Sequence, residues 1–223
     1  MTTTTGGRPL LKDRAYEHIK TLILDGTYRP GQFISERDLT AKLDMSKTPI
    51  RAALEQLEVE GFVTIAPQRG VIVRELNPRE ISDHYEFRMA IESWIVQQVA
   101  GRLTKAQSDE LGANLALQHQ QTGGPEIDVK GFMNSDVEFH RLITLCTGNA
   151  EFERAMRHQS DKLRRLVETI AMRDLTVPPR SCAEHQAIFE ALIEGDGDRA
   201  SRLVVEHLAH GRTFLLLGGS YGA

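Results

Sequence analysis

The sequence lacks any apolar run approaching the ~20 residues that a helix needs to cross a bilayer. It also lacks an apolar stretch after Met1 of the kind that a signal peptide carries, so we expect a soluble, cytoplasmic protein. Cysteine is scarce, because Cys146 and Cys182 are too few for a disulfide framework and lack a paired zinc-ribbon spacing. These absences, with a balanced composition, exclude collagen-like and disordered classes and leave a globular chain of one large or two small domains.

An excess of positive charge is also missing. The formal net charge is -4 over 223 residues. Residues 1–76 carry 11 lysines and arginines against 10 acidic residues, whereas residues 77–223 carry 16 against 21. Because neither part is strongly basic, an argument for a nucleic-acid partner must rest on where individual cations lie.

Apolar spacing and caps predict three short helices in the first part of the chain. The first covers residues 11–24, the second is capped by Ser35 and runs to Leu43, and the third runs from the cap Ser46 to Gly61. The second and third helices are separated by so few residues that they are typical of a helix-turn-helix.

A two-stranded hairpin is expected directly after these helices. Apolar residues at 62–65 and 71–73 flank a turn that contains Pro67 and Gly70. The sequence therefore predicts a winged helix-turn-helix with three helices and a two-stranded wing. We expect this domain over residues 10–75, after a disordered tail of residues 1–9.

The remainder of the chain shows helical periodicity without strand-like alternation, so the fold class is mainly α. An all-α bundle of six or seven helices is expected over residues 81–217, after a linker at 76–80 and before a tail at 218–223. The predicted helices cover residues 78–103, 105–121, 127–146, 150–172, 182–194 and 197–217. Capping signals at Asn77, Thr104 and Ser181 mark three of their starts.

The third helix carries a candidate DNA-reading face. Lys47 and Arg51 are four residues apart and lie opposite the apolar stripe of that helix. A helix fits the major groove of DNA, where lysine and arginine can donate to guanine. An ordinary solvated face is the alternative for such a pair. Further candidate contacts are Arg37, Lys42, Thr48 and, at the hairpin tip, Arg69 and Gly70.

Several segments resemble the DNA-binding signature of the GntR family of bacterial transcription regulators. They are residues 35–39 (SERDL), 45–54 (MSKTPIRAAL), 57–61 (LEVEG) and 69–71 (RGV). The sequence departs from the family at Lys47, where arginine is usual, and at Ala52, where glutamate is usual. The resemblance implies a homodimer whose winged helices bind the two halves of a near-palindromic operator.

The helical part contains a candidate metal-binding pattern. Asp136 and His140 are four residues apart, which places a carboxylate and an imidazole on one helix face. His185 and His207 lie on two later helices and have apolar neighbours, so they could also point inward. One carboxylate with three imidazoles suits Zn, Ni, Mn or Fe. Spacing alone does not select these three among the eight histidines, because an inward histidine is more often a hydrogen-bonded core residue.

The same part resembles the FCD effector domain of the FadR subgroup, whose metal-binding members carry Asp-x-x-x-His on one helix and a histidine on each of two later helices. Asp136, His140, His185 and His207 match this pattern, so the resemblance implies that they hold a divalent metal ion. It also implies that Arg88 binds the carboxylate of an effector. The alternative for this arginine is a surface pair with Glu92.

Together these features predict a sequence-specific DNA-binding transcriptional regulator and not an enzyme. We expect a repressor that a small organic acid controls by binding at the metal site. Two alternatives stay open at this point. One is a metal-dependent hydrolase or lyase that uses the Asp/His cluster, and the other is a regulator whose metal is purely structural.

Overall fold

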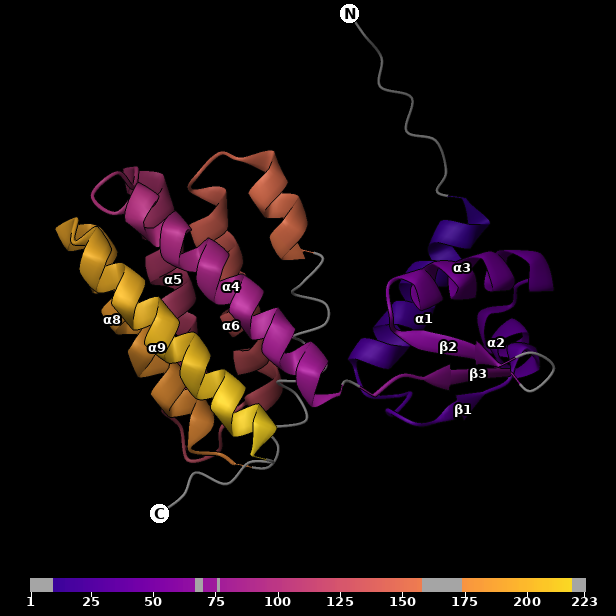
Figure 1. Cartoon of the computed structure of the whole chain (residues 1–223). Helices are drawn as coiled ribbons and strands as arrows, with labels where there is room; N and C mark the ends of the chain where they lie inside the picture. Colours follow the sequence, from indigo (N-terminus) through magenta and orange to yellow (C-terminus); the bar gives the residue numbers. More distant parts are fainter. Residues whose placement is uncertain (1–9, 67–69, 76, 158–173, 218–223) are drawn as a thin grey trace, which may run out of the picture. The chain divides into compact units, whose positions relative to one another are not determined.

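The computed structural model describes residues 10–66, 70–75, 77–157 and 174–217. The chain divides into two units, Met1–Glu75 and Leu76–Ala223. Each unit has its own hydrophobic core, and Figure 1 shows a small sheet with helices in the first and helices alone in the second.

The first unit combines three helices with a three-stranded antiparallel sheet. The helices are α1 (Leu11–Leu24), α2 (Glu36–Leu43) and α3 (Lys47–Val59). The strands are β1 (Phe33–Ile34), β2 (Val63–Ala66) and β3 (Gly70–Val73), in the order β1-β3-β2. This is the winged helix-turn-helix that the sequence predicts, with one strand more.

The additional strand corrects the two-stranded wing expected from the sequence. In β1, Phe33 pairs with Ile72 and Ile34 pairs with Val71. Ile34 is buried while Phe33 is half exposed. A strand of two residues is too short to show an alternating pattern, so it could not be recognised from periodicity.

In the residues that the structure describes after Asn77, the second unit contains helices and the loops between them. The helices are α4 (Pro78–Val99), α5 (Lys105–Thr122), α6 (Val129–Leu145), α8 (Val177–Glu194) and α9 (Gly197–Leu216). Residues 150–157 are helical too, and the rest of the helix predicted at 150–172 lies outside the described residues. Apolar residues of α4, α5, α6, α8 and α9 share one core.

Three predicted boundaries differ from the structure by three residues or more. Helix α8 begins at Val177, so Ser181 is an interior residue; prolines are tolerated in a first turn, where no intrahelical N–H bond is lost. Helix α4 ends at Val99 and not at residue 103, because Gly101 takes a positive φ of 69°. The linker expected at 76–80 is shorter, since α4 already begins at Pro78.

The capping signals have mixed outcomes. Asn77 and Thr104 form complete capping boxes at the starts of α4 and α5. The Ser35 side chain accepts a hydrogen bond from the backbone N–H of Asp38. Ser46 occupies the N-cap position of α3, but its side chain accepts no capping hydrogen bond from the described first turn.

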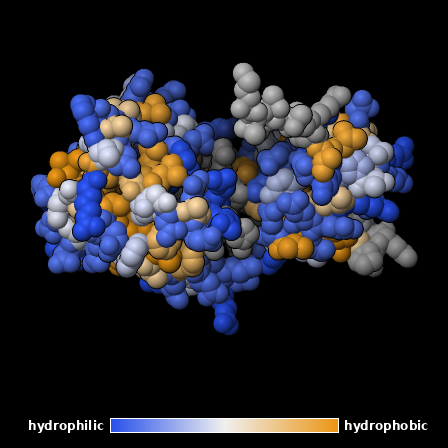
Figure 2. Space-filling model, turned by 90° about the horizontal axis from the view of Figure 1, so that it is seen from above, coloured by the Kyte–Doolittle hydropathy of each residue, from blue (hydrophilic) through white to orange (hydrophobic). Residues whose placement is uncertain are grey.

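The surface is mixed in polarity. Figure 2 shows one face on which hydrophilic side chains predominate and apolar ones gather in separate patches. Among the described residues, no helix combines the length and the apolar character needed to cross a membrane.

Candidate metal centre and nucleic-acid interface

Helix α3 has one buried and one exposed side. Ile50, Leu54 and Leu57 are at most 1% exposed and pack in the core of the first unit. Lys47 and Arg51 are exposed. The 3.6-residue period puts residues 47 and 51 on one face, which borders the apolar stripe and does not lie opposite it as expected from the sequence. The cationic face is thus available to a partner of opposite charge.

An ion pair joins this face to the start of α2. Arg51 Nε lies 2.9 Å from the carboxylate of Glu36, and the arginine side chain remains 60% exposed. Arg37 in the first turn of α2 and Thr48 in the first turn of α3 are also exposed. Lys42 lies at the other end of α2 with its Nζ 5.0 Å from the centre of the Tyr28 ring.

The tip of the wing is described only in part. Arg69 lies outside the described residues. Gly70 has a φ of 116°, and a Cβ there would lie 2.4 Å from the Phe33 ring and 3.0 Å from the Ile34 carbonyl oxygen. The structure therefore gives Gly70 a conformational role in the sheet.

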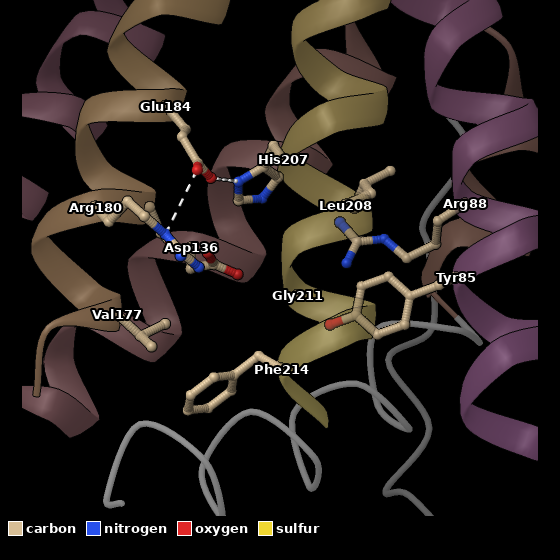
Figure 3. A pocket seen from close by; sticks show the side chains of 11 residues that line it. Tyr85, Arg88, Asp136, Val177, Arg180, Glu184, His207, Leu208, Gly211 and Phe214 are labelled. Carbon is tan, nitrogen blue, oxygen red and sulfur yellow. Dashed lines mark hydrogen bonds and ion pairs between the residues drawn. The ribbon is translucent and has the colours of Figure 1, made fainter. Parts of the chain in front are cut away.

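Four side chains meet in the second unit as a potential metal-binding cluster. Asp136 and His140 come from α6, His185 from α8 and His207 from α9. All four are buried, and one candidate ligand atom from each lies within 4.8 Å of the others. Figure 3 shows Asp136 and His207 among the side chains that line the cavity beside this cluster. The structure thus brings together the four residues that the sequence singles out.

A carboxylate on α4 orients the first histidine. His140 Nδ1 lies 2.6 Å from Oε2 of Glu92, and the other oxygen of Glu92 accepts a 2.6 Å hydrogen bond from Arg88 Nε. Because a carboxylate accepts hydrogen bonds, the proton of His140 belongs on Nδ1 and the lone pair on Nε2. The surface pair considered for Arg88 is wrong, since both Arg88 and Glu92 are buried.

The other two histidines are oriented in the same way. His185 Nδ1 lies 2.8 Å from Oε1 of Gln118 on α5. His207 Nδ1 lies 2.7 Å from Oε2 of Glu184 on α8. Each contact assigns a proton to Nδ1, so Nε2 of each ring faces the cluster. An acceptor behind each ligating imidazole is the usual arrangement at protein metal sites.

The Nε2 atoms of the three histidines, which face the cluster, are better suited to binding a cation than to hydrogen bonding with one another. His140 Nε2 is buried and has no hydrogen-bond partner among the described residues. His185 Nε2 lies 3.2 Å from His207 Nε2 and 3.6 Å from the Asp136 carboxylate. A buried acceptor without a partner is costly. The donor set of one carboxylate and three imidazoles therefore fits a divalent transition metal.

The pKa shifts favour the ligating form of these groups. Burial lowers the pKa of His140, and it lowers the pKa of His185 well below the ordinary value. Burial raises the pKa of Glu92, but the charges of Arg88 and His140 outweigh it and lower that pKa to about 2. Burial lowers the pKa of Arg88, yet the charge of Glu92 raises it on balance. The lowered pKa values of His140 and His185 favour their neutral forms at neutral pH, beside a charged Arg88–Glu92 pair.

A cavity of about 50 Å³ adjoins the cluster. Figure 3 shows Arg88 and Tyr85 reaching into it from α4, Arg180 from α8, and Phe214 from α9. Arg180 Nε also lies 3.5 Å from Glu184. Two guanidinium groups and an aromatic wall next to a cluster of imidazoles form a setting for a small anion.

Sequence reasoning missed the residues behind the histidines. Gln118 and Asn114 share the inward face of α5 with Leu111 and Leu115, and all four are buried. A polar residue in phase with a leucine stripe is a detectable signal. Glu92 and Glu184 lie on helix turns that also face the core, and only the structure shows which histidine each contacts.

Comparison with protein families assigns both parts of the chain. Residues 11–73 match the model described as "Bacterial regulatory proteins, gntR family". Residues 83–210 match the model of the FCD domain. The two matches correspond to the unit with the sheet and to the helical unit.

Curated relatives cover most of the chain. An uncharacterized HTH-type transcriptional regulator of Streptomyces ambofaciens is 29% identical, with 92% of this chain and 84% of that protein aligned. The HTH-type transcriptional repressor RspR of Escherichia coli K12 is 26% identical, with 89% and 86% aligned. The repressor NanR of Citrobacter rodentium is 29% identical, with 90% and 84% aligned.

Solved structures share the fold. A protein from Rhodococcus sp. RHA1 named as a GntR transcriptional regulator superposes with a TM-score of 0.80 at 23% identity, covering 94% of this chain and 99% of that one. E. coli McbR/YncC gives 0.79 at 17% identity, covering 96% and 100%.

Proposed function

The chain belongs to the GntR family of bacterial transcriptional regulators and carries an FCD domain, and from this premise we propose that it is a homodimeric repressor controlled by a small organic acid. In this proposal a divalent metal ion at the Asp/His cluster helps to hold the acid. Curated relatives named as repressors support the sign of the regulation. Because the chain belongs to a family of regulators, we do not retain the alternative of a hydrolase or lyase.

The exposed face of α3 carries the DNA-binding part of the proposal. Lys47 and Arg51 are exposed on a helix whose Ile50, Leu54 and Leu57 pack in the core, and an exposed cationic helix face is what major-groove recognition requires. Two protomers related by a two-fold axis would present two such helices to a palindromic site. Each well-formed pair between a side chain and a base contributes on the order of 1–3 kcal/mol of discrimination against the wrong base.

The DNA test is a gel shift on duplexes that the wild-type protein selects from a random library. We expect Lys47→Ala/Arg51→Ala to lower affinity at least tenfold and to relax base preference. The charge-matched control is Lys105→Ala/Arg154→Ala, which removes two exposed cations from helices of the other unit. Equal binding by the folded α3 variant and wild type would refute the assignment of this face.

The cluster of Asp136 and three histidines carries the metal part of the proposal. The decisive observation is the buried, unpartnered Nε2 of His140 beside two other inward nitrogens. Elemental analysis of the purified protein and titration of the metal-free protein with Zn²⁺ test it. We expect one ion per chain for wild type and none for His185→Ala. A wild type that binds none of Zn²⁺, Ni²⁺, Mn²⁺ or Fe²⁺ would remove the metal from the proposal.

The cavity beside the cluster carries the effector part. Arg88 is buried and held charged inside the unit, so a carboxylate that reaches it would gain a charge-assisted hydrogen bond. A cavity of about 50 Å³ favours acids of a few carbon atoms. If acid binding shifts the two DNA-binding units out of register with the operator, it lowers DNA affinity.

The effector test begins with a thermal-shift screen of small mono- and dicarboxylates on metal-loaded protein. An acid that binds is then titrated into the gel shift, where we expect it to release DNA. Arg88→Lys keeps the buried charge opposite Glu92 but loses the planar fork of arginine, so it should weaken acid binding and retain metal. An acid that binds without changing DNA affinity would disprove effector control.

A further inference from the structure

Helix α5 supplies none of the four candidate ligands, yet it buries two amides on its inward face, and one of them contacts His185. Gln118 is 0% exposed and Asn114 is 9% exposed. Burying an amide costs free energy unless its hydrogen bonds are replaced. The hydrogen bonds that the buried Gln118 amide makes inside the protein indicate its role.

Both amides are oriented by one carbonyl group. Gln118 Nε2 donates to Asn114 Oδ1 at 2.7 Å and lies 3.3 Å from the Ser135 carbonyl oxygen. Asn114 Nδ2 donates to the same carbonyl at 3.1 Å. A rotated Gln118 amide would set its oxygen against two acceptors, so the network fixes which end faces where.

The remaining end of Gln118 faces the cluster. Its Oε1 lies 2.8 Å from His185 Nδ1. Since Oε1 can only accept, the proton of a neutral His185 must lie on Nδ1. Ser135 directly precedes the ligand Asp136 on α6, so the same network also connects α5 to the turn that carries Asp136.

We infer that Gln118 is a positioning residue, which holds His185 in the Nδ1–H form and turns its Nε2 lone pair toward the metal position before any metal binds. This inference rests on the proposed metal site. His140 and His207 have carboxylates in the corresponding place, whereas Gln118 orients His185 without adding a charge to the cluster. The neutral amide suits the fully buried ring of His185, because it adds no charge to an interior that cannot solvate one.

The first test reads the ring directly in the metal-free full chain. Two-bond ¹⁵N–¹H correlations of ¹⁵N-histidine-labelled protein distinguish the tautomers, and His185→Ala identifies the His185 signals. We expect wild-type His185 with a protonated Nδ1 and an unprotonated Nε2. Gln118→Met removes the acceptor at similar length and should give a mixture of tautomers or the Nε2–H form.

The matched control is Gln121→Met. Gln121 lies on the same helix and accepts a hydrogen bond from the Ser135 hydroxyl, but its described contacts do not include His185. This variant should therefore keep the wild-type tautomer. A role that is only structural would disturb α5 in both variants and leave the tautomer unchanged in both.

The second test measures Zn²⁺ affinity by competition with a chelating dye. We expect Gln118→Met to bind 10–100-fold more weakly, in the range found for partners of metal ligands, and Gln121→Met to stay within about twofold of wild type.

The outcomes separate the two proposals. A wild type that binds Zn²⁺ but carries the Nε2–H form of His185 without metal would overturn the inference and leave the metal site standing. A wild type with the expected tautomer that binds none of Zn²⁺, Ni²⁺, Mn²⁺ or Fe²⁺ would overturn the proposed metal site instead. Equal Zn²⁺ affinity of wild type and Gln118→Met would also overturn the inference. The first reading is made on wild-type protein, and a variant is needed only to assign the His185 signals.

Discussion

At the scale of single residues, one phenol ties two helices of the first unit together. Tyr16 on α1 donates a 2.6 Å hydrogen bond to the carboxylate of Glu60, the residue that follows α3. Lys20 donates to the Tyr16 hydroxyl at 2.6 Å and lies 3.4 Å from Glu60. Burial raises the pKa of Glu60, but hydrogen bonds from Tyr16 and Gln56 and the charge of Lys20 outweigh it and lower that pKa.

This network predicts a defined pH dependence. Because the folded-state pKa of Glu60 is below its unfolded value of 4.5, its stabilisation is complete above pH 4.5 and disappears as the pH falls through the folded pKa. Tyr16→Phe should lower the free energy of unfolding by about 1 kcal/mol at pH 7. Amide hydrogen exchange in α1 and α3 measures the loss. A difference between variant and wild type that stays constant below pH 4 would contradict this account.

Gly70 permits a close approach between strands that a side chain would block. Its φ of 116° is unfavourable for other residues, and a Cβ would meet both Phe33 and the Ile34 carbonyl. The Phe33 ring is exposed and can move, but the backbone carbonyl cannot. We expect Gly70→Ala to destabilise the first unit by about 1–3 kcal/mol, as measured by hydrogen exchange of its amides.

Gly26 provides the control for that substitution. It also has a positive φ, 76°, but a Cβ there would meet nothing within 4 Å. Gly26→Ala should therefore carry only the backbone cost, about 1 kcal/mol. If both variants lose the same stability, the contact with β1 has no energetic role.

At the scale of elements, the start of α4 is fixed by a complete capping box. The Asn77 side chain accepts from the Glu80 N–H at 2.9 Å, and the Glu80 carboxylate accepts from the Asn77 N–H at 3.0 Å. Asn77→Ala should cost about 1 kcal/mol, whereas Asn77→Asp keeps the cap and should cost little. Urea unfolding followed by fluorescence of Trp94, the only tryptophan and a residue of α4, measures both. Equal losses in the two variants would show that the cap is not the cause.

Elements were predictable where their signal is local. Helix α1 shows a complete apolar period, and the caps Asn77 and Thr104 mark their helix starts. Strand β1 was missed because its partner β3 lies far along the chain. The predicted start of α8 is too late, because Pro178 and Pro179 lie in its first turn and prolines are also typical of the break between two helices.

The residues of the candidate site also divide into those that a local pattern reveals and those that it does not. Asp136 and His140 share a helix face by spacing alone, whereas His185 and His207 were selected through family resemblance. Gln118 could be placed on an inward face but not opposite a particular ring. That pairing depends on how α5 packs against α8, which no local pattern encodes.

At the scale of the whole molecule, the cluster joins helices that are distant in sequence. The four candidate ligands come from α6, α8 and α9, and the carboxylate behind His140 comes from α4. An ion bound there would contact only the folded second unit. A ligand that binds only the folded state stabilises it in proportion to the logarithm of its concentration over its Kd.

Metal removal should therefore act on the two units unequally. At a metal concentration of 1,000 times Kd the stabilisation is about 4 kcal/mol, so chelation should lower the melting temperature and speed exchange of α4, α6, α8 and α9 amides. Amides of α1 and α3 should keep their protection, because their core is separate. His185→Ala serves as the control, since a chain without the site should not respond to a chelator.

The same experiment separates a regulatory metal from a structural one. Chelated protein is compared with metal-loaded protein in the gel shift, with and without an acid that binds the loaded form. If the metal helps to hold the acid, chelation should abolish release of DNA by that acid at temperatures where the second unit is still folded. If release persists at the same acid concentration, the ion only stabilises the fold, and Arg88 and its cavity must bind the effector without it.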